Sequence, residues 1–286
     1  MALSLYLDDD DPWIIEQQIF DILNDYLQPK SNITAAAAAQ SIDNLFPVNR
    51  QDDEEKEDPG SFLWHLWGRF HRTAQQIPHA HPAQDKLAAL IKCLRSFPSR
   101  TPVVYLSSWD AEYKLWEDLP LLGPTFQEEW DVIGLTDQEE CQRNRNLNAY
   151  AARIFRDGSA NLELFAIRAL AAALEGRAVY RHAHTTAPQI EASFTPGLEL
   201  DSLVSIAADW VAHCGEILLA LSRKGVSSSG DHGGPLREKE QGFSLERWGL
   251  WKERFAEISR TAHINEETKR LAQGTRRLMD ELEKSC

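Results

Sequence analysis

The sequence has few cysteines, and they lie far apart. Cys93, Cys141, Cys214 and Cys286 form no C-x-x-C pair in the 286 residues. Zinc sites and disulfide frameworks need closer spacing or more cysteines, so we expect neither. The thiols are expected to be reduced, which favours a cytoplasmic or nuclear location and argues against secretion.

No targeting or membrane-spanning segment is apparent in the sequence. The first eleven residues, MALSLYLDDDD, have neither the basic start nor the apolar run of a secretory signal. We expect no window to reach the roughly 18 apolar residues that a membrane span requires. We therefore expect a protein that is not secreted and has no membrane partner.

Basic residues are too few for a general nucleic-acid binder. The chain has 30 Lys and Arg against 44 Asp and Glu, a formal charge of −14. Neutralising phosphates requires a basic face, so we expect no nucleic-acid partner. Hydrophobic residues make up 43% of the chain, which is ordinary for a globular protein and enough to form a core.

The common catalytic motifs are also missing. The sequence contains no G-x-x-x-x-G-K-[ST] loop, no G-x-G-x-x-G after a strand, no G-x-S-x-G elbow and no H-E-x-x-H pair. These absences weaken the nucleotide-binding, dinucleotide-binding, α/β-hydrolase and zinc-protease interpretations. No catalytic residue can be assigned from motifs.

Apolar residues recur at helical spacing from one end of the chain to the other. About ten helices are indicated, which predicts an all-α fold in a single irregular array. We expect one domain over residues 1–286, with two lobes at 1–174 and 199–286 as the alternative. Residues 224–242 are rich in Gly and Ser and are predicted to be a flexible segment.

Polar residues indicate where these helices begin. Asp11 before Pro12 is typical of an N-cap followed by proline at the first helical position. Thr136 and Glu139 have the spacing of a capping box. The other expected helix starts are Ser61, Asn161, Asp201, Ser244 and Asn265.

Two segments in the middle of the chain are less regular. Residues 102–106 (PVVYL) have the composition of a strand, but no second strand is apparent, so we interpret them as an extended loop. Residues 109–119 are predicted to be helical, with Trp109 and Trp116 seven residues apart on one face.

Five segments in order resemble an uncharacterised helical family of filamentous fungi, known as domain of unknown function 3632. They are residues 82–87 (PAQDKL), 116–120 (WEDLP), 146–152 (NLNAYAA), 207–210 (AADW) leading to Gly215, and 243–248 (FSLERW) leading to Trp251 and Phe255. The resemblance implies a fungal, intracellular, helical protein. It supplies no catalytic residues, and it leaves the first 58 residues unexplained.

Two pairs of tryptophans have similar surroundings in the sequence. Trp64 and Trp67 lie three residues apart before a phenylalanine, as do Trp248 and Trp251. Two copies do not make a repeat. Tryptophans at this spacing most simply pack in a core, and the alternative is that they line a groove that binds a ligand.

Three oxygen-bearing residues share one helix face. Asp201, Ser205 and Asp209 lie at i, i+4 and i+8, which resembles the second magnesium motif of class I terpene synthases. Such a site needs a second acidic cluster, for which the candidates are residues 8–11, 52–55 and 128–131. The simpler interpretation makes Asp201 an N-cap and leaves Asp209 in water or paired with an arginine. We expect no cofactor, with Mg²⁺ as the alternative.

Histidines offer no stronger site. Asp209 and His213 lie at i and i+4, so they could form an acid–base dyad or a structural pair. His213 and Cys214 are adjacent and point apart on a helix. His182 and His184 form an H-x-H pair, but a metal needs three or four convergent ligands.

Two classes of function are compatible with these patterns. The first is a non-catalytic helical module that binds a protein partner or an apolar small molecule. The second is an enzyme of secondary metabolism that acts on an apolar substrate, for example by magnesium-dependent isoprenoid diphosphate chemistry. The first is favoured because no catalytic set can be assembled. The oligomeric state cannot be derived from the sequence.

Overall fold

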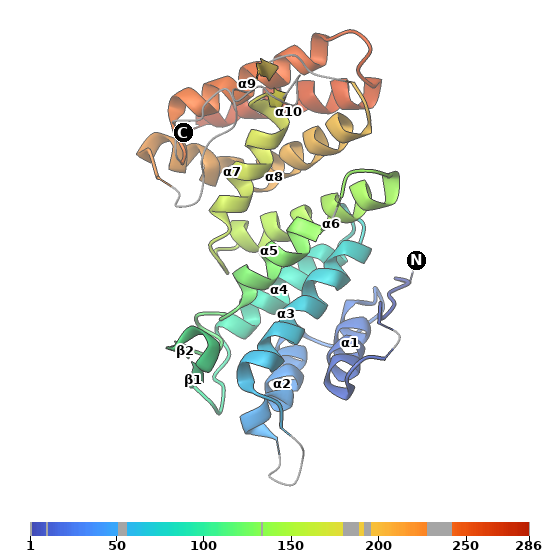
Figure 1. Ribbon diagram of the computed structural model, residues 1–286, viewed down its shortest axis with the longest axis vertical. Coiled ribbons are helices and arrows are strands. Elements are labelled where there is room, and N and C mark those ends of the chain that lie inside the picture. Colours follow the sequence, from blue (N-terminus) through green and yellow to red (C-terminus); the bar gives the residue numbers. More distant parts are fainter. Residues whose placement is uncertain are drawn as a thin grey trace. The chain divides into compact units, whose positions relative to one another are not determined.

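The computed structural model describes residues 2–9, 11–50, 56–132, 134–179, 189–191, 196–227 and 242–285 (Figure 1). Ten α-helices lie within these ranges, and the strands there are only three or four residues long, so the predicted all-α fold is confirmed. The His182–His184 pair, Cys286, residues 52–55 and most of the predicted flexible segment fall outside the described residues.

The chain divides into two compact units. Unit 1 comprises Met1–Gly134 with Asp157–Ala160, and unit 2 comprises Leu135–Arg156 with Asn161–Cys286. The division lies near residue 134 and not at residues 175–198, between the two lobes considered above. The helices at residues 138–156 and 163–174 belong to unit 2 because they pack on its helix at residues 198–224.

Unit 1 is an array of five helices with one hairpin. In chain order its elements are α1 (Ile14–Leu27), α2 (Ala35–Leu45), η1 (Pro47–Asn49), α3 (Pro59–Gln76), α4 (Ala83–Arg95), β1 (Val103–Leu106), η2 (Ser107–Trp109), β2 (Ala111–Lys114) and α5 (Leu122–Val132). Helix α3 contacts α1, α4 and α5, so it is the central element of this unit.

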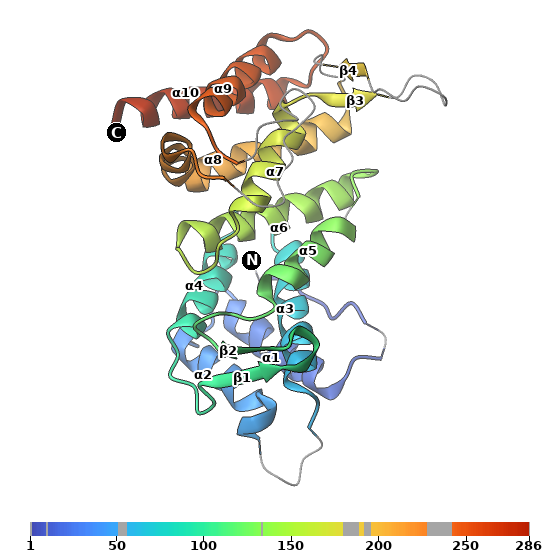
Figure 2. The same cartoon turned by 60° about the vertical axis from the view of Figure 1, so that its left-hand side comes forward.

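The hairpin corrects both predictions for the middle of the chain. Strands β1 and β2 pair antiparallel, with Val103 opposite Lys114 and Leu106 opposite Ala111 (Figure 2). The turn depends on Asp110, whose φ of 47° lies in the left-handed region that aspartate tolerates better than most residues. The predicted extended loop is therefore a strand, and the start of the predicted 109–119 helix is its partner.

Buried polar contacts fix the core of unit 1. Trp67 donates its indole N–H to the carbonyl of Pro120 at 2.7 Å, and Trp116 donates to Asp43 at 2.7 Å. His71 is fully buried, and desolvation lowers its pKa to about 3, so the ring is neutral in the folded protein. These partners allow large polar side chains to lie inside an apolar core.

Unit 2 is built around one long helix. Its elements are α6 (Gln138–Arg156), α7 (Glu163–Leu174), β3 (Arg177–Val179), β4 (Gln189–Glu191), α8 (Leu198–Lys224), α9 (Leu245–Arg260) and α10 (Glu266–Ser285). Helix α8 contacts α6, α7, α9 and α10. Gly215 on α8 permits a close approach of α10, because a Cβ atom there would lie 2.5 Å from Leu282.

Helix α8 also corrects the expectation that no segment is apolar enough to span a membrane. By length and composition alone, it could cross one, although Asp209, His213 and Glu216 interrupt the apolar run. More than half of its most apolar window is buried against the rest of the protein. A core helix of a water-soluble domain has the same composition, so this helix is weak evidence for a membrane.

Most helices begin near the predicted residues, but several caps differ. Helix α1 begins after Trp13, whose backbone N–H is bound by Glu16, and α3 is capped by Asp58 instead of Ser61. Asp137, not Thr136, accepts the first backbone bonds of α6. Asp201 lies inside α8, which begins at Leu198. Ser244 and Asn265 accept backbone bonds at the starts of α9 and α10, as predicted.

Candidate functional site

An apolar–polar alternation runs through the residues before α1. Leu3, Leu5 and Leu7 are half-buried, whereas the residues between them are exposed, which is typical of an extended segment lying on a surface. We call residues 3–8 the strap.

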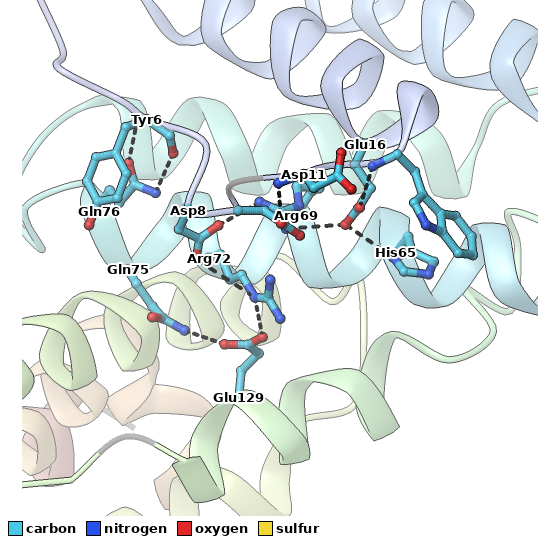
Figure 3. Close-up of polar contacts among 12 residues, drawn as sticks. Tyr6, Asp8, Asp11, Glu16, His65, Arg69, Arg72, Gln75, Gln76 and Glu129 are labelled. Carbon is cyan, nitrogen blue, oxygen red and sulfur yellow. Dashed lines mark hydrogen bonds and ion pairs between the residues drawn. The ribbon is translucent and has the colours of Figure 1, made fainter.

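Two glutamines bind the backbone of the strap. The N–H of Tyr6 donates to Oε1 of Gln76 at 2.9 Å, and Nε2 of Gln76 donates back to the carbonyl of Tyr6 at 3.0 Å (Figure 3). Gln28 makes the same pair of bonds with Leu3, at 3.1 and 3.4 Å. Each amide side chain therefore satisfies both backbone groups of one residue, as a neighbouring strand would.

Charged residues continue the contact beyond Tyr6. Asp8 accepts from Arg69 of α3 at 2.6 Å and lies 4.0 Å from Arg72 (Figure 3). Each arginine also has a carboxylate partner on a helix. Arg69 donates to Glu16 of α1 at 3.2 Å, and Arg72 donates to Glu129 of α5 at 2.8 Å.

Helical spacing explains why these groups meet. His65, Arg69, Arg72 and Gln76 follow one another at intervals of four, three and four residues, so they form one face of α3. Burial disfavours the charged form of Arg72, but the hydrogen bond and the charge of Glu129 outweigh this effect, and its pKa is raised. Arg72 is therefore charged at neutral pH.

A small hollow lies beside this network. It has a volume of about 280 Å³ and is walled partly by Trp13, Trp64 and His65. Trp13 and His65 are in ring contact, with centroids 4.5 Å apart. Five carboxylates and two arginines also line it: Asp9, Asp11, Glu16, Glu128, Glu129, Arg69 and Arg72. We call it the acidic hollow, because carboxylates outnumber cations.

A larger groove also borders Trp13. Its volume is about 1160 Å³, and its apolar lining comes from Trp13, Ile14 and Ile15 of the α1 region and Leu45 of α2. Trp13 is 52% exposed and Ile14 is 81% exposed. The charged residues that line it are Asp11, Arg50, Lys56, Glu57 and Arg100. We call it the Trp13 groove.

The structure places three of the four predicted ligand-binding tryptophans in protein cores. Trp67, Trp248 and Trp251 are almost fully buried, and each indole N–H binds a protein acceptor: Pro120, Glu283 and Glu175 respectively. Trp64 differs, because it is only half-buried and lines the acidic hollow. Core packing thus accounts for three of these residues, and a surface hollow includes the fourth.

The predicted magnesium residues do not converge on a site. Thr268 donates to Asp201, and Ser205 donates to the backbone carbonyl of Asp201 at 2.7 Å. Both oxygens of Asp209 accept from Arg145, at 2.7 and 3.0 Å. Among the described residues, no group of three or more His, Cys, Asp or Glu side chains is placed to hold a metal. The i, i+4, i+8 spacing is therefore explained by structural contacts within unit 2.

The predicted dyad of Asp209 and His213 on α8 also includes a carboxylate that is held by a structural contact. Because Arg145 binds both oxygens of Asp209, this carboxylate is already engaged on the side that faces α6. His213 is half-buried one turn further along the helix. The thiol of Cys214 is buried and donates to the carbonyl of Ala152, which is a structural role.

The strap and Trp13 were not predicted as site residues from the sequence. A usable signal exists in the LSLYLD alternation, which is typical of an extended segment. Trp13 follows Pro12, where the sequence predicts the first turn of a helix, and its exposure depends on tertiary packing.

Comparison with known proteins identifies a family but no function. A family model described as "Protein of unknown function (DUF3632)" matches residues 67–255, about two thirds of the chain. The match confirms the resemblance found in the sequence. No curated protein matches the chain.

Proposed function

Because the chain belongs to the DUF3632 family, whose function is unknown, we propose a function from the geometry of unit 1 alone. The protein is a non-catalytic helical module that binds a protein partner in the Trp13 groove. The observation that carries this proposal is the pair of strongly exposed apolar side chains, Trp13 and Ile14, on the wall of a groove of about 1160 Å³.

The apolar lining supports a macromolecular partner. An isoleucine that is 81% exposed beside a half-exposed tryptophan leaves apolar surface in water, which is unfavourable unless a partner covers it. Tryptophan is enriched among the residues that contribute most to binding at protein interfaces. The groove volume of about 1160 Å³ also lies above the roughly 300–1,000 Å³ of typical small-molecule pockets.

The charged lining indicates the chemistry of the partner. Arg50 pairs with Glu57, and Nζ of Lys56 lies against the carbonyl of Arg50, whereas Arg100 is exposed. Three cations and two carboxylates line a groove in a chain of formal charge −14. The groove is therefore suited to a partner segment with apolar side chains and at least one carboxylate.

The enzyme alternative has less support in the geometry. An active site of that kind needs an enclosed apolar cavity with convergent, free polar groups. In the acidic hollow, Glu16 and Glu129 are both bound to arginines, so these two carboxylates are already engaged in ion pairs.

A displayed library of random twelve-residue peptides, selected against the full chain, tests the proposal. We expect the enriched peptides to combine apolar and acidic residues and to bind more weakly as salt is raised. Affinity for Trp13→Ala should fall at least about tenfold, as for an interface anchor. Trp109→Ala is the matched control, because Trp109 is 49% exposed and lies on the hairpin, outside the groove.

Charge reversal gives a second matched pair. Arg100→Glu should reduce the affinity for the acidic peptides, whereas Lys30→Glu, at an exposed lysine outside the groove, should change it little. Peptides that bind Trp13→Ala and the unchanged protein equally well would contradict the proposed site.

A further inference from the structure

Four hydrogen bonds join the strap to the C-cap of α1 and to α3 through its backbone, so they do not depend on its side chains. Gln28 and Gln76 each bind the N–H and the C=O of one strap residue, so they recognise an extended backbone of almost any sequence. Specificity comes from two further features: apolar side chains at alternate positions and the carboxylate of Asp8 at Arg69. These are the elements of a peptide-recognition surface.

The surface beneath the strap keeps its charges satisfied when Asp8 is removed. The side chain of Arg69 is only 3% exposed, so it would be costly to bury without a partner. Glu16 supplies that partner from α1, and Glu129 supplies one to Arg72 from α5. Release of the strap therefore leaves neither arginine without a carboxylate, and the surface is preserved for another occupant.

We propose that the strap is an internal ligand on a peptide-binding surface formed by Gln28, Arg69, Arg72 and Gln76, and that an extended partner segment with alternating apolar residues and a following carboxylate displaces it. This surface is distinct from the Trp13 groove, so the inference does not depend on the proposed function. A segment tethered this closely has an effective concentration in the millimolar range. A partner segment therefore binds only when its concentration and affinity suffice to compete with the strap.

The test uses the full chain and a synthetic peptide of residues 2–9, ALSLYLDD, labelled with fluorescein. In an Asp8→Lys variant, the new ammonium group faces Arg69 and Arg72 and repels the chain's own strap. We expect the peptide to bind this variant at least about tenfold more tightly than the unchanged protein, provided that its Kd lies about tenfold or more below the millimolar effective concentration of the tethered strap. Asp21→Lys, at an exposed aspartate on α1, is the matched control and should bind as weakly as the unchanged protein.

Changes in the peptide and in the surface separate specific binding from charge attraction. Two altered peptides, one with Asp8→Asn and one with scrambled residues, should each bind the Asp8→Lys protein at least about tenfold more weakly than the original peptide does. The original peptide should lose affinity by a similar factor when Gln76→Ala is added to the Asp8→Lys protein. A Tyr6→Pro variant loosens the strap without changing charge, because proline cannot donate to Gln76. It should also gain peptide affinity.

Three outcomes would overturn the inference. They are failure of the peptide to bind either loosened variant, equal binding of the scrambled peptide, and a dimer in which the strap of one copy lies on the surface of another. Circular dichroism melting of each variant verifies that it is folded before binding is measured.

Discussion

The two units differ in where they place apolar and charged side chains. Within the described residues, eight of the ten exposed large hydrophobic side chains belong to unit 1 and two to unit 2. Unit 2 instead buries an ion pair completely: Arg247 donates to both oxygens of Glu175, at 2.6 and 3.1 Å, and both side chains are 0% exposed. Within the described residues, unit 1 therefore exposes more large apolar side chains, and unit 2 contains an ion pair with no exposed surface.

The family match covers only part of unit 1. It begins at residue 67, so it includes Arg69, Arg72, Gln76 and Arg100 but excludes the strap, Trp13 and Gln28. Both proposed binding surfaces therefore combine residues from inside and outside the matched region. They are proposals for this chain and not for the whole family.

The largest effect is expected from breaking the buried pair in unit 2. Arg247→Met removes the guanidinium that binds both oxygens of the buried Glu175 carboxylate, so the free energy of unfolding should fall by about 3–5 kcal/mol. Chemical denaturation measures the loss. Glu266→Gln, which removes an exposed pair with Lys269, should leave the unfolding midpoint almost unchanged. Equal effects of the two substitutions would show that burial does not distinguish these pairs.

A smaller effect is expected from the buried histidine of unit 1. Burial lowers the pKa of His71 to about 3, so below pH 6.5 the unfolded chain binds a proton that the folded protein does not. Stability is lost as pH falls, by about 2 kcal/mol between pH 7 and pH 5 from this residue.

The contribution of His71 is isolated by comparing two proteins at both pH values. In His71→Gln, the loss of unfolding free energy between pH 7 and pH 5 should be smaller by this amount, because glutamine does not titrate. Identical pH profiles for the two proteins would mean that His71 is accessible to protons in the folded state.

A cap in unit 2 should contribute less. Ser244 accepts from the backbone N–H of Arg247 at 3.0 Å, and Ser244→Ala should reduce the free energy of unfolding by about 1 kcal/mol. Ser244→Asp is the matched variant, because aspartate also caps, and it should retain most of the stability. A destabilised aspartate variant alongside a stable alanine variant would contradict the capping role.

The smallest effect on stability is expected at Trp13, although this residue should have a large effect on binding. Because Trp13 is half-exposed, Trp13→Ala should change the free energy of unfolding by less than about 1 kcal/mol. Thermal melting measures this directly. A loss similar to that of Arg247→Met would assign Trp13 to the core of unit 1 and remove the contrast between the units.

Local patterns in the sequence predicted most helices because capping and apolar spacing act within a few residues. The start of α9 at Ser244 and that of α10 at Asn265 are examples. The hairpin was missed because its strands have only four residues each and one of them, AEYK, has little β propensity on its own. Pairing with β1 overrides that weak preference.

The candidate site was harder to predict because its contacts are distant in sequence. Asp8 and Arg69 are 61 residues apart, and Tyr6 and Gln76 are 70 apart. No local pattern links a glutamine at the end of α3 to a particular backbone amide. Trp67 and Trp251 were conspicuous as residue types, whereas their burial depends on the whole array of helices.

The two glutamine contacts have a consequence for aggregation. In an extended segment, backbone groups of residues separated by an odd number point to opposite edges, so Gln28 at Leu3 and Gln76 at Tyr6 occupy both edges of the strap. An uncovered LSLYL stretch would be a template for pairing with other chains. The amides that hold the strap in place therefore also block one pairing position on each of its edges against a further strand.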